Sequence, residues 1–283
     1  MIRMKKFTLI VFLLLTMVMY SCDDRNDYMV IIRTEYGDMK ALLYNETPLH
    51  KENFLTLAKE GKYDSTTWHR VMENFMVQGG DIKRKESSFE GVAIPPEFTD
   101  GFMHTKGTLA AARQPDNVNP DKESSPSQFY IVDGKQFSVQ EMTIDEYQLN
   151  TGINQLLQQE EYDSIYQRFV EVARLKDQEQ MRALAFEYID LVESELGINL
   201  KKEVAADRLE AYTTLGGAPH LDGEYTIFGR IVEGLDVIDK IAAVPVDRQN
   251  NPAKPVYLFM EVIKVSKKEI TEKYGYEYPK ATK

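Results

Sequence analysis

Residues 68–81 read WHRVMENFMVQGGD and are the most informative segment of the chain. At its centre is a short apolar run, residues 75–77, which soon ends at two glycines. Similar short runs recur at residues 109–112 and 129–132, with Gly, Pro and Asp between them. Several short β-prone segments separated by turn residues are typical of an antiparallel barrel or sandwich. The residues alone leave these two architectures open.

Two regular elements are predicted before this region. Residues 28–44 predict a β-hairpin, because two β-prone runs flank a turn at residues 36–38. Residues 48–60 predict a helix, since Thr47 is a good N-cap and Pro48 suits the first helical position. The apolar residues of this helix fall on one face, which predicts packing against the strands.

Residues 133–218 differ in composition from the chain on either side. They contain no proline, and 17 acidic residues stand against 8 basic ones. Apolar residues recur at helical spacing, as at Ile165, Phe169 and Val172. This pattern predicts two or three amphipathic helices, after which β-prone sequence returns at residues 225–228 and 256–265.

The N-terminus has the pattern of an export signal. A positively charged start precedes an apolar run of 13 residues, 8–20, and Cys22 follows soon after. Because a membrane-spanning helix needs about 20 apolar residues, the run predicts a secretory signal peptide. The cysteine at the expected cleavage site resembles a bacterial lipoprotein signal, which implies lipidation of Cys22. An ordinary signal peptide with an incidental cysteine is the alternative.

The predicted organisation therefore has five parts. They are a signal peptide (1–21), a lipidated tether (22–27), a β domain in two pieces (28–132 and 219–268), a helical insertion (133–218) and a C-terminal tail (269–283). We expect an exported protein anchored by lipid to the cell envelope, in the periplasm or on the cell surface, with the outer membrane favoured by acidic residues after Cys22.

Composition excludes several classes of function. The formal net charge of −11 argues against a nucleic-acid partner, which would need a basic surface. The single cysteine excludes an intramolecular disulfide, and the four histidines show no metal-ligand spacing. We expect no metal and no cofactor.

Four blocks of sequence resemble, in order, those of the cyclophilin-type peptidyl-prolyl cis-trans isomerases. They are residues 68–81, 107–113, 127–131 and 221–229. The resemblance implies a mainly β fold, a closed eight-stranded antiparallel barrel with capping helices. In this chain the barrel would carry the inserted α-helical lobe.

The resemblance also implies an active site. Arg70 matches the catalytic arginine of the family, and Gln78 and Phe75 are assigned to catalysis with it. The positions assigned to substrate binding are Met76, Ala112, Arg113, Gln128, Phe129, Tyr130, His220, Leu221 and Tyr225. Isomerising an X-Pro bond breaks no bond, so the chemistry requires neither a nucleophile nor a metal.

The chain departs from the family at four of these positions. Tyr130 replaces the commonest phenylalanine, Arg113 an asparagine, His220 a tryptophan and Tyr225 a histidine. These departures argue against tight binding of cyclosporin, but not against isomerase activity.

The helical insertion is the largest departure. We expect it to emerge beside the active-site rim, where it either holds client chains or pairs with a second copy. A surface insertion without a role of its own is the alternative.

Three functions remain open at this point. We favour an isomerase that acts on proline-containing unfolded or flexible polypeptides during the folding of exported proteins. A non-catalytic chaperone or scaffold would use the same groove and the insertion only to hold peptides. An adhesion or assembly protein would depend mainly on the insertion.

Overall fold

The computed structural model describes residues 25–279, so the predicted signal peptide and Cys22 lie outside the described part. The chain divides into two compact units. The first joins the residues up to Lys135 with those from Gly217 onward, and the second is Gln136–Gly216. Within the described residues, no helix combines the length and the apolar character needed to cross a membrane.

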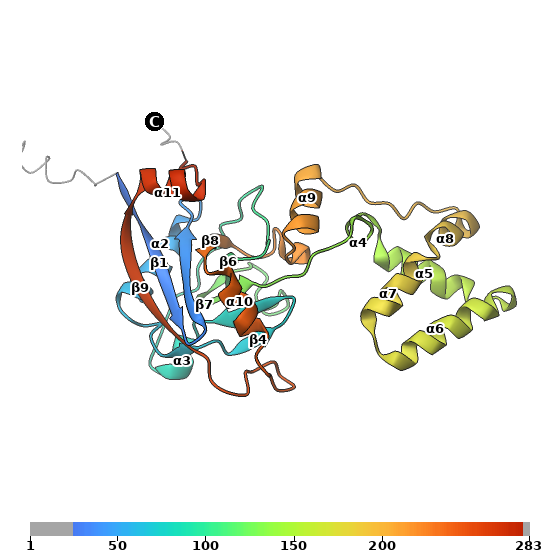
Figure 1. The fold of residues 1–283 in the computed structure, drawn as a ribbon, viewed down its shortest axis with the longest axis horizontal. Coiled ribbons are helices and arrows are strands. Elements are labelled where there is room, and N and C mark those ends of the chain that lie inside the picture. The colour runs from blue at the N-terminus through green and yellow to red at the C-terminus, as the bar shows by residue number, and fades with distance from the viewer. Residues whose placement is uncertain (1–24, 280–283) are drawn as a thin grey trace, which may run out of the picture. The chain divides into compact units, whose positions relative to one another are not determined.

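The first unit is built on one antiparallel sheet, which has nine strands in the described chain (Figure 1). In sequence order these are β1 Asn26–Thr34, β2 Gly37–Leu43, β3 Thr66–Thr67, β4 Arg70–Met72, β5 Met76–Gly79, β6 Thr108–Arg113, β7 Ser124–Val132, β8 Ile227–Glu233 and β9 Tyr257–Ser266. Their order in the sheet is β3-β9-β1-β2-β8-β6-β7-β5-β4. The first and last strands of the chain therefore pair with each other, and both lie inside the sheet.

The predicted closed barrel of eight strands is corrected by this arrangement. The sheet curls, but in the described chain no ladder joins its edge strands, β3 and β4. These two strands are separated only by Trp68 and His69. Trp68 N–H donates to the carbonyl of Val256, next to β9, over 2.9 Å, whereas His69 N–H donates to the carbonyl of Gln78 in β5 over 3.0 Å. The chain thus crosses from one edge of the sheet to the other between β3 and β4.

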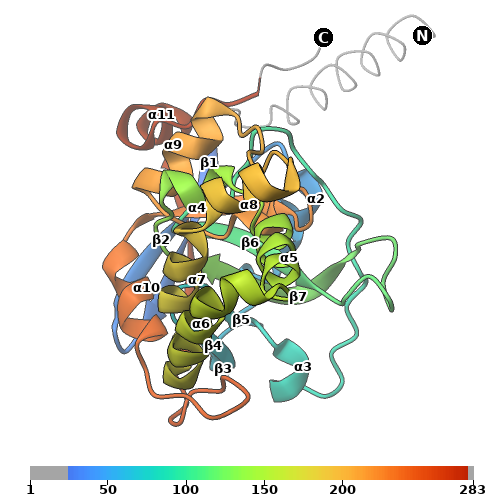
Figure 2. The ribbon, with the colours of Figure 1, turned by 90° about the vertical axis from the view of Figure 1, so that its right-hand side faces the viewer.

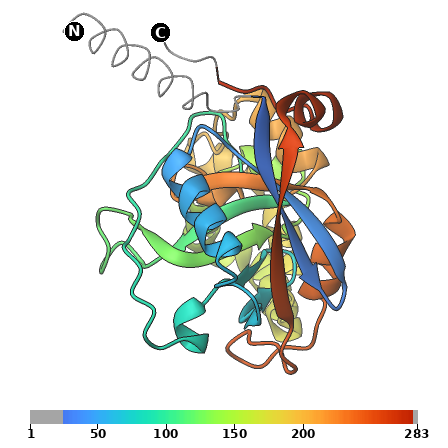
Figure 3. The same ribbon diagram turned by 90° about the vertical axis from the view of Figure 1, so that its left-hand side faces the viewer.

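The inner face of the sheet holds the main core. Helices α2 (Pro48–Lys59) and α10 (Leu235–Ala242) contribute to this core, and Figure 3 shows α2 against the sheet. The aromatic rings of Phe54, Tyr63 and Trp68 all lie near Phe129, with centroid distances of 5.3, 5.6 and 5.5 Å. Their edge-on geometry is the favoured one for aromatic pairs, so Phe129 is the centre of the packing.

The outer face of β1 and β2 is covered by the C-terminal residues. Met29 and Leu42 lie opposite each other in the ladder and pack against Ile270 and Tyr276. Ile270 belongs to helix α11 (Lys267–Tyr274), which begins after Ser266, whose side chain accepts a hydrogen bond from Glu269 N–H. Residues 269–279 are therefore a packed element of the fold and differ from the tail that was expected.

The second unit is helical. Its helices are α4 Val139–Thr143, α5 Glu146–Leu156, η2 Glu160–Tyr162, α6 Asp163–Leu175, α7 Gln178–Phe186, α8 Ile189–Leu196 and α9 Ala206–Thr214, several of which face the viewer in Figure 2. Helices α5 and α8 form its centre, where Leu149 and Val192 are fully buried. The expectation of two or three helices was too low, because several of these helices are only two turns long and carry too few apolar residues for a periodicity to stand out.

Candidate active site

The candidate site lies on the sheet face opposite the main core. The ladders place Arg70 opposite Gln78 and Gln78 opposite Tyr130, so that one row of side chains crosses β4, β5 and β7. Residues paired directly across a sheet point to the same face. The row therefore brings a guanidinium, an amide and a phenol together, although their positions in the chain are up to 60 residues apart.

A small hollow of about 90 Å³ lies along this row. Nine of the twelve positions predicted for catalysis or substrate binding line it. They are Arg70, Phe75, Met76, Gln78, Ala112, Arg113, Tyr130, Leu221 and Tyr225. The short 3₁₀ segment η3 (Pro219–Leu221) supplies Leu221, which packs with Met76 and Tyr130 in one apolar cluster. The hollow thus has an apolar floor, with the arginine among its lining residues.

Arg70 is held by two neighbours and keeps part of its capacity to donate. One terminal nitrogen, Nη1, donates to Gln78 Oε1 over 3.4 Å, and the other, Nη2, donates to the sulfur of Met72 over 3.2 Å. Gln78 Nε2 in turn donates to Gln128 Oε1 over 3.0 Å. An arginine has five N–H donors, so most of them stay free for a ligand.

A comparison with family models identifies the family of this chain. The model described as "Cyclophilin type peptidyl-prolyl cis-trans isomerase/CLD" matches residues 29–173 and 198–261. This chain belongs to that family. The expected resemblance and enzyme class are confirmed at this level.

Relatives of this cyclophilin carry names of the same kind. A peptidyl-prolyl cis-trans isomerase of Acinetobacter baylyi is 27% identical over 243 residues, which cover 83% of this chain and 85% of the relative. A Streptococcus pyogenes protein, named for both a phosphatase and a peptidyl-prolyl cis-trans isomerase activity, is 27% identical over 235 residues, but this match spans only 37% of its length. A crystal structure of a cyclophilin-type isomerase from Cryptosporidium parvum aligns over 86% of this chain and 98% of its own, with 18% identity and a TM-score of 0.48.

Three predicted residues of this cyclophilin lie outside the hollow. Gln128 stands beside it and contacts Gln78. His220 lies next to Phe75, with ring centroids 5.3 Å apart, and burial lowers the pKa of its imidazole. The prediction for Phe129 is wrong: its side chain is in the main core, because successive residues of β7 point to opposite faces of the sheet and Tyr130 takes the pocket side.

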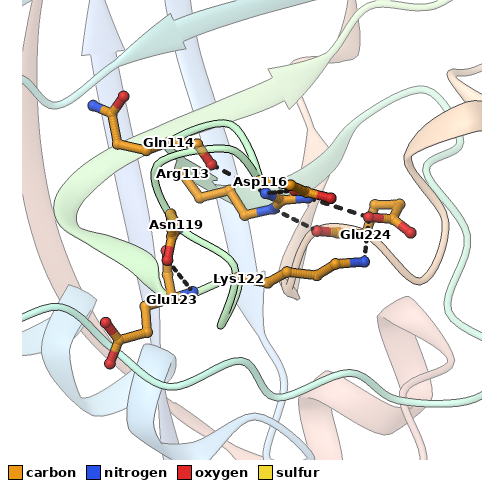
Figure 4. A network of polar contacts seen from close by, with 7 residues as sticks. All are labelled: Arg113, Gln114, Asp116, Asn119, Lys122, Glu123 and Glu224. Atoms are coloured by element: carbon orange, nitrogen blue, oxygen red, sulfur yellow. Dashed lines mark hydrogen bonds and ion pairs between the residues drawn. The ribbon is translucent and has the colours of Figure 1, made fainter.

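Arg113 lines the hollow, but its guanidinium is already engaged (Figure 4). Its Nε donates to the carbonyl of Glu224 over 2.8 Å, and its Nη groups form ion pairs with Glu224 and Asp116. The guanidinium also lies over the ring of Tyr225, 4.6 Å from its centroid. Lys122 pairs with Glu224 as well. Arg113 therefore ties the β6–β7 loop to the pocket wall, which differs from the direct substrate contact that was predicted.

One residue of the site was missed by the sequence reasoning. His104, fully buried, places its Nε2 2.9 Å from the hydroxyl of Tyr130. It belongs to no strand, and no motif links it to Tyr130. Among residues 25–279, no group of three or more His, Cys, Asp or Glu side chains is arranged to hold a metal.

Proposed function

We propose that this cyclophilin isomerises X-Pro bonds in unfolded or flexible polypeptides, with Arg70 stabilising the twisted prolyl amide. The observation that carries the proposal is the position of Arg70 beside an apolar hollow. Within residues 25–279, no carboxylate forms an ion pair with it. A cation with free donors beside an apolar floor suits a ligand that has an apolar ring and a developing lone pair.

The chemistry follows from the amide bond. Rotation about an X-Pro bond is slow because amide resonance must be lost, at a barrier of about 18–20 kcal/mol. In the twisted state the proline nitrogen regains a lone pair, which can accept a hydrogen bond. A donor fixed near that nitrogen binds the twisted state more strongly than either planar isomer, and this difference is what lowers the barrier.

Arg70 would supply part of the catalysis. Uncatalysed isomerisation takes tens to hundreds of seconds, so an enzyme working at about 10³ s⁻¹ needs roughly 10⁵-fold, or about 7 kcal/mol. One charged donor aimed at a transition state is worth about 3–4 kcal/mol. Gripping the ring on Phe75, Met76 and Leu221, while the acyl side rotates, would supply the remainder through orientation.

The test is isomerisation of a short X-Pro peptide by the chain from Asp23 onward and by its Arg70→Ala variant. We expect kcat to fall about 10²- to 10³-fold, with KM changed far less. Arg70→Lys keeps the charge but not the planar fork of donors, so it should recover little. A folded wild type that binds the peptide without isomerising it would instead favour the non-catalytic chaperone or scaffold.

A second role for the helical unit is favoured by helix α6. This helix carries several apolar side chains but buries none of its residues. Tyr166 and Val170 lie one turn apart on it and take no part in the core of the unit. Residues 136–216 hold 16 acidic against 7 basic residues, a net charge of −9. A second copy would carry the same charge and be repelled, so we propose that this face binds unfolded segments that are apolar and basic.

Binding of an unfolded, proline-free polypeptide of positive net charge tests this role without involving the isomerase site. We expect the Tyr166→Ser/Val170→Ser variant to bind it at least several-fold more weakly, and Gln167→Ser, an exposed polar change on the same helix, to bind as the wild type does. Equal binding by all three would refute the role. If the wild type instead formed concentration-dependent dimers, and only the double variant lost them, the face would serve self-association rather than the binding of unfolded segments.

We also propose that the chain is exported and anchored by lipid at Cys22. The proposal is supported by the charged start, the short apolar run and the cysteine that follows. Expression of the full chain and of Cys22→Ser in a Gram-negative host tests it. The wild type should enter the membrane fraction with a lipid-modified N-terminal peptide by mass spectrometry, and the variant should not. Equal fractionation of both would overturn it.

A further inference from the structure

Tyr130 forms one wall of the hollow, and its hydroxyl points away into the protein. The hydroxyl lies 2.9 Å from His104 Nε2, and His104 is fully buried. The two rings are nearly parallel, at 14°. A buried polar ring of this kind is expected to have a partner at each nitrogen.

The second partner of His104 fixes the direction of these hydrogen bonds. His104 Nδ1 lies 2.8 Å from Asp222 Oδ1. In a neutral imidazole only one nitrogen carries a hydrogen, and an ionised carboxylate only accepts, so that hydrogen is on Nδ1 and Nε2 is left as an acceptor. The hydroxyl of Tyr130 therefore donates to Nε2. The order of donation is Tyr130 to His104 to Asp222.

The same histidine is joined by its backbone to the opposite wall. Its N–H donates to Asp222 Oδ1 over 2.8 Å, and its carbonyl accepts from Ala218 N–H over 2.8 Å. Residues 218–222 include Leu221, which faces Tyr130 across the apolar cluster. His104 thus bonds to the wall formed by β7 on one side and to the wall formed by residues 218–222 on the other.

We propose that His104 and Asp222 are positioning residues, which set the width of the proline pocket by fixing Tyr130 relative to Leu221. This inference rests on the proposed isomerase function. Neither residue touches the hollow, so both act through the two pocket walls. Phenylalanine, the usual residue at this position, has no hydroxyl. The hydroxyl of Tyr130 is therefore the group that joins the pocket wall to the buried side chains of His104 and Asp222. Displacements of about 1 Å in such a site can change rates about 10²-fold, which is the scale on which pocket width matters.

A double-mutant cycle between Tyr130→Phe and His104→Asn tests the proposal. Phenylalanine removes the hydroxyl, and asparagine keeps a donor that can face Asp222 but has no group at the Nε2 position. Each single variant breaks the hydrogen bond between the two side chains. We expect each to raise KM about tenfold with kcat within about threefold, and the double variant to be no worse than the worse single one.

Two comparisons keep the outcome unambiguous. His50→Asn is the matched control, because His50 is also buried and bonded to a carboxylate, Glu97, but does not line the hollow. It should leave KM unchanged in the folded protein. Arg70→Ala should lower kcat rather than raise KM. The isomerase proposal is therefore tested by kcat of that variant, and the positioning proposal by KM of the Tyr130 and His104 variants.

Three results would overturn the inference. They are an unchanged KM in both single variants, effects on KM that multiply in the double variant, and an equal rise in KM for His50→Asn. Should His104→Asn not fold, ¹⁵N resonances of the wild-type imidazole decide, since the proposal requires the hydrogen of His104 on Nδ1. A hydrogen on Nε2 would refute it.

Discussion

Replacing Arg113 by methionine should measure what the buried network beside the pocket contributes to stability. Methionine keeps the apolar stem and removes only the guanidinium. The side chain of Arg113 is 4% exposed, whereas its partners Asp116 and Glu224 are 61% and 42% exposed. The two carboxylates therefore regain water when the arginine is lost, and their ion pairs add little to stability.

Most of the loss should come from two other contacts. The hydrogen bond from Nε to the carbonyl of Glu224 is made by a charged donor, and such bonds are worth about 1.5–3 kcal/mol. The contact with the ring of Tyr225 adds about 0.5–1 kcal/mol or somewhat more. We expect the free energy of unfolding to fall by about 2–4 kcal/mol. KM should rise as well, because Tyr225 loses its support.

Urea unfolding followed by tryptophan fluorescence measures this loss. Trp68 is the only tryptophan of the chain and is fully buried in the first unit, so its emission reports on that unit. The matched control is Arg33→Met, since Arg33 also pairs with two carboxylates but is 49% exposed. Arg33→Met should barely shift the urea midpoint of unfolding. If Arg113→Met moved the midpoint no further than Arg33→Met, the argument from burial would be refuted.

Three further predictions concern Arg70, Phe129 and Glu233. The kcat for a prolyl peptide should stay flat between about pH 6 and 9, because the proposed chemistry transfers no proton, and a bell-shaped profile would assign the chemistry to another group. Phe129→Ala should lower the free energy of unfolding by about 3–5 kcal/mol in the urea assay, and a loss below about 1 kcal/mol would contradict its central place in the core. Hydrogen bonds from Lys273 and Tyr274 lower the pKa of Glu233 from 4.5 to about 2. Since a lowered carboxyl pKa stabilises the fold above the unfolded value, this stabilisation should disappear as pH falls from about 4.5 to about 2, and Glu233→Gln should make unfolding less sensitive to pH in that window.

Much of the site could be predicted, because its residues are close together in the sequence or lie in the four blocks that resemble the family. Residues 75–78 supply Phe75, Met76 and Gln78 from one turn and one short strand. Assigning Phe129 together with Tyr130 was an avoidable error. Phe129 and Tyr130 lie in a regular stretch of β7, where side chains alternate between faces, so only one of the two could line the pocket with its side chain.

Other features depend on contacts that cannot be predicted from the sequence. His104 meets Tyr130 across 26 residues and Asp222 across 118, and no spacing rule connects them. The break between β3 and β4 depends on hydrogen bonds of the backbone, since Trp68 N–H bonds beside β9 and His69 N–H bonds to β5. The C-terminal helix, by contrast, had a readable signal, because Ser266 and Glu269 form the usual start of a helix and Ile270 follows.

The pairing of β1 with β9 also sets the order in which the parts of this protein can fold during synthesis. About 230 residues separate the two strands, so at roughly 5–20 residues per second β1 waits about 10–50 s for its partner. The helical unit, residues 136–216, is continuous in sequence and precedes β8 and β9, and helical folds are among the fastest to form. It can therefore be complete on a nascent chain whose sheet is still open, and only the last strand to leave the ribosome completes the sheet.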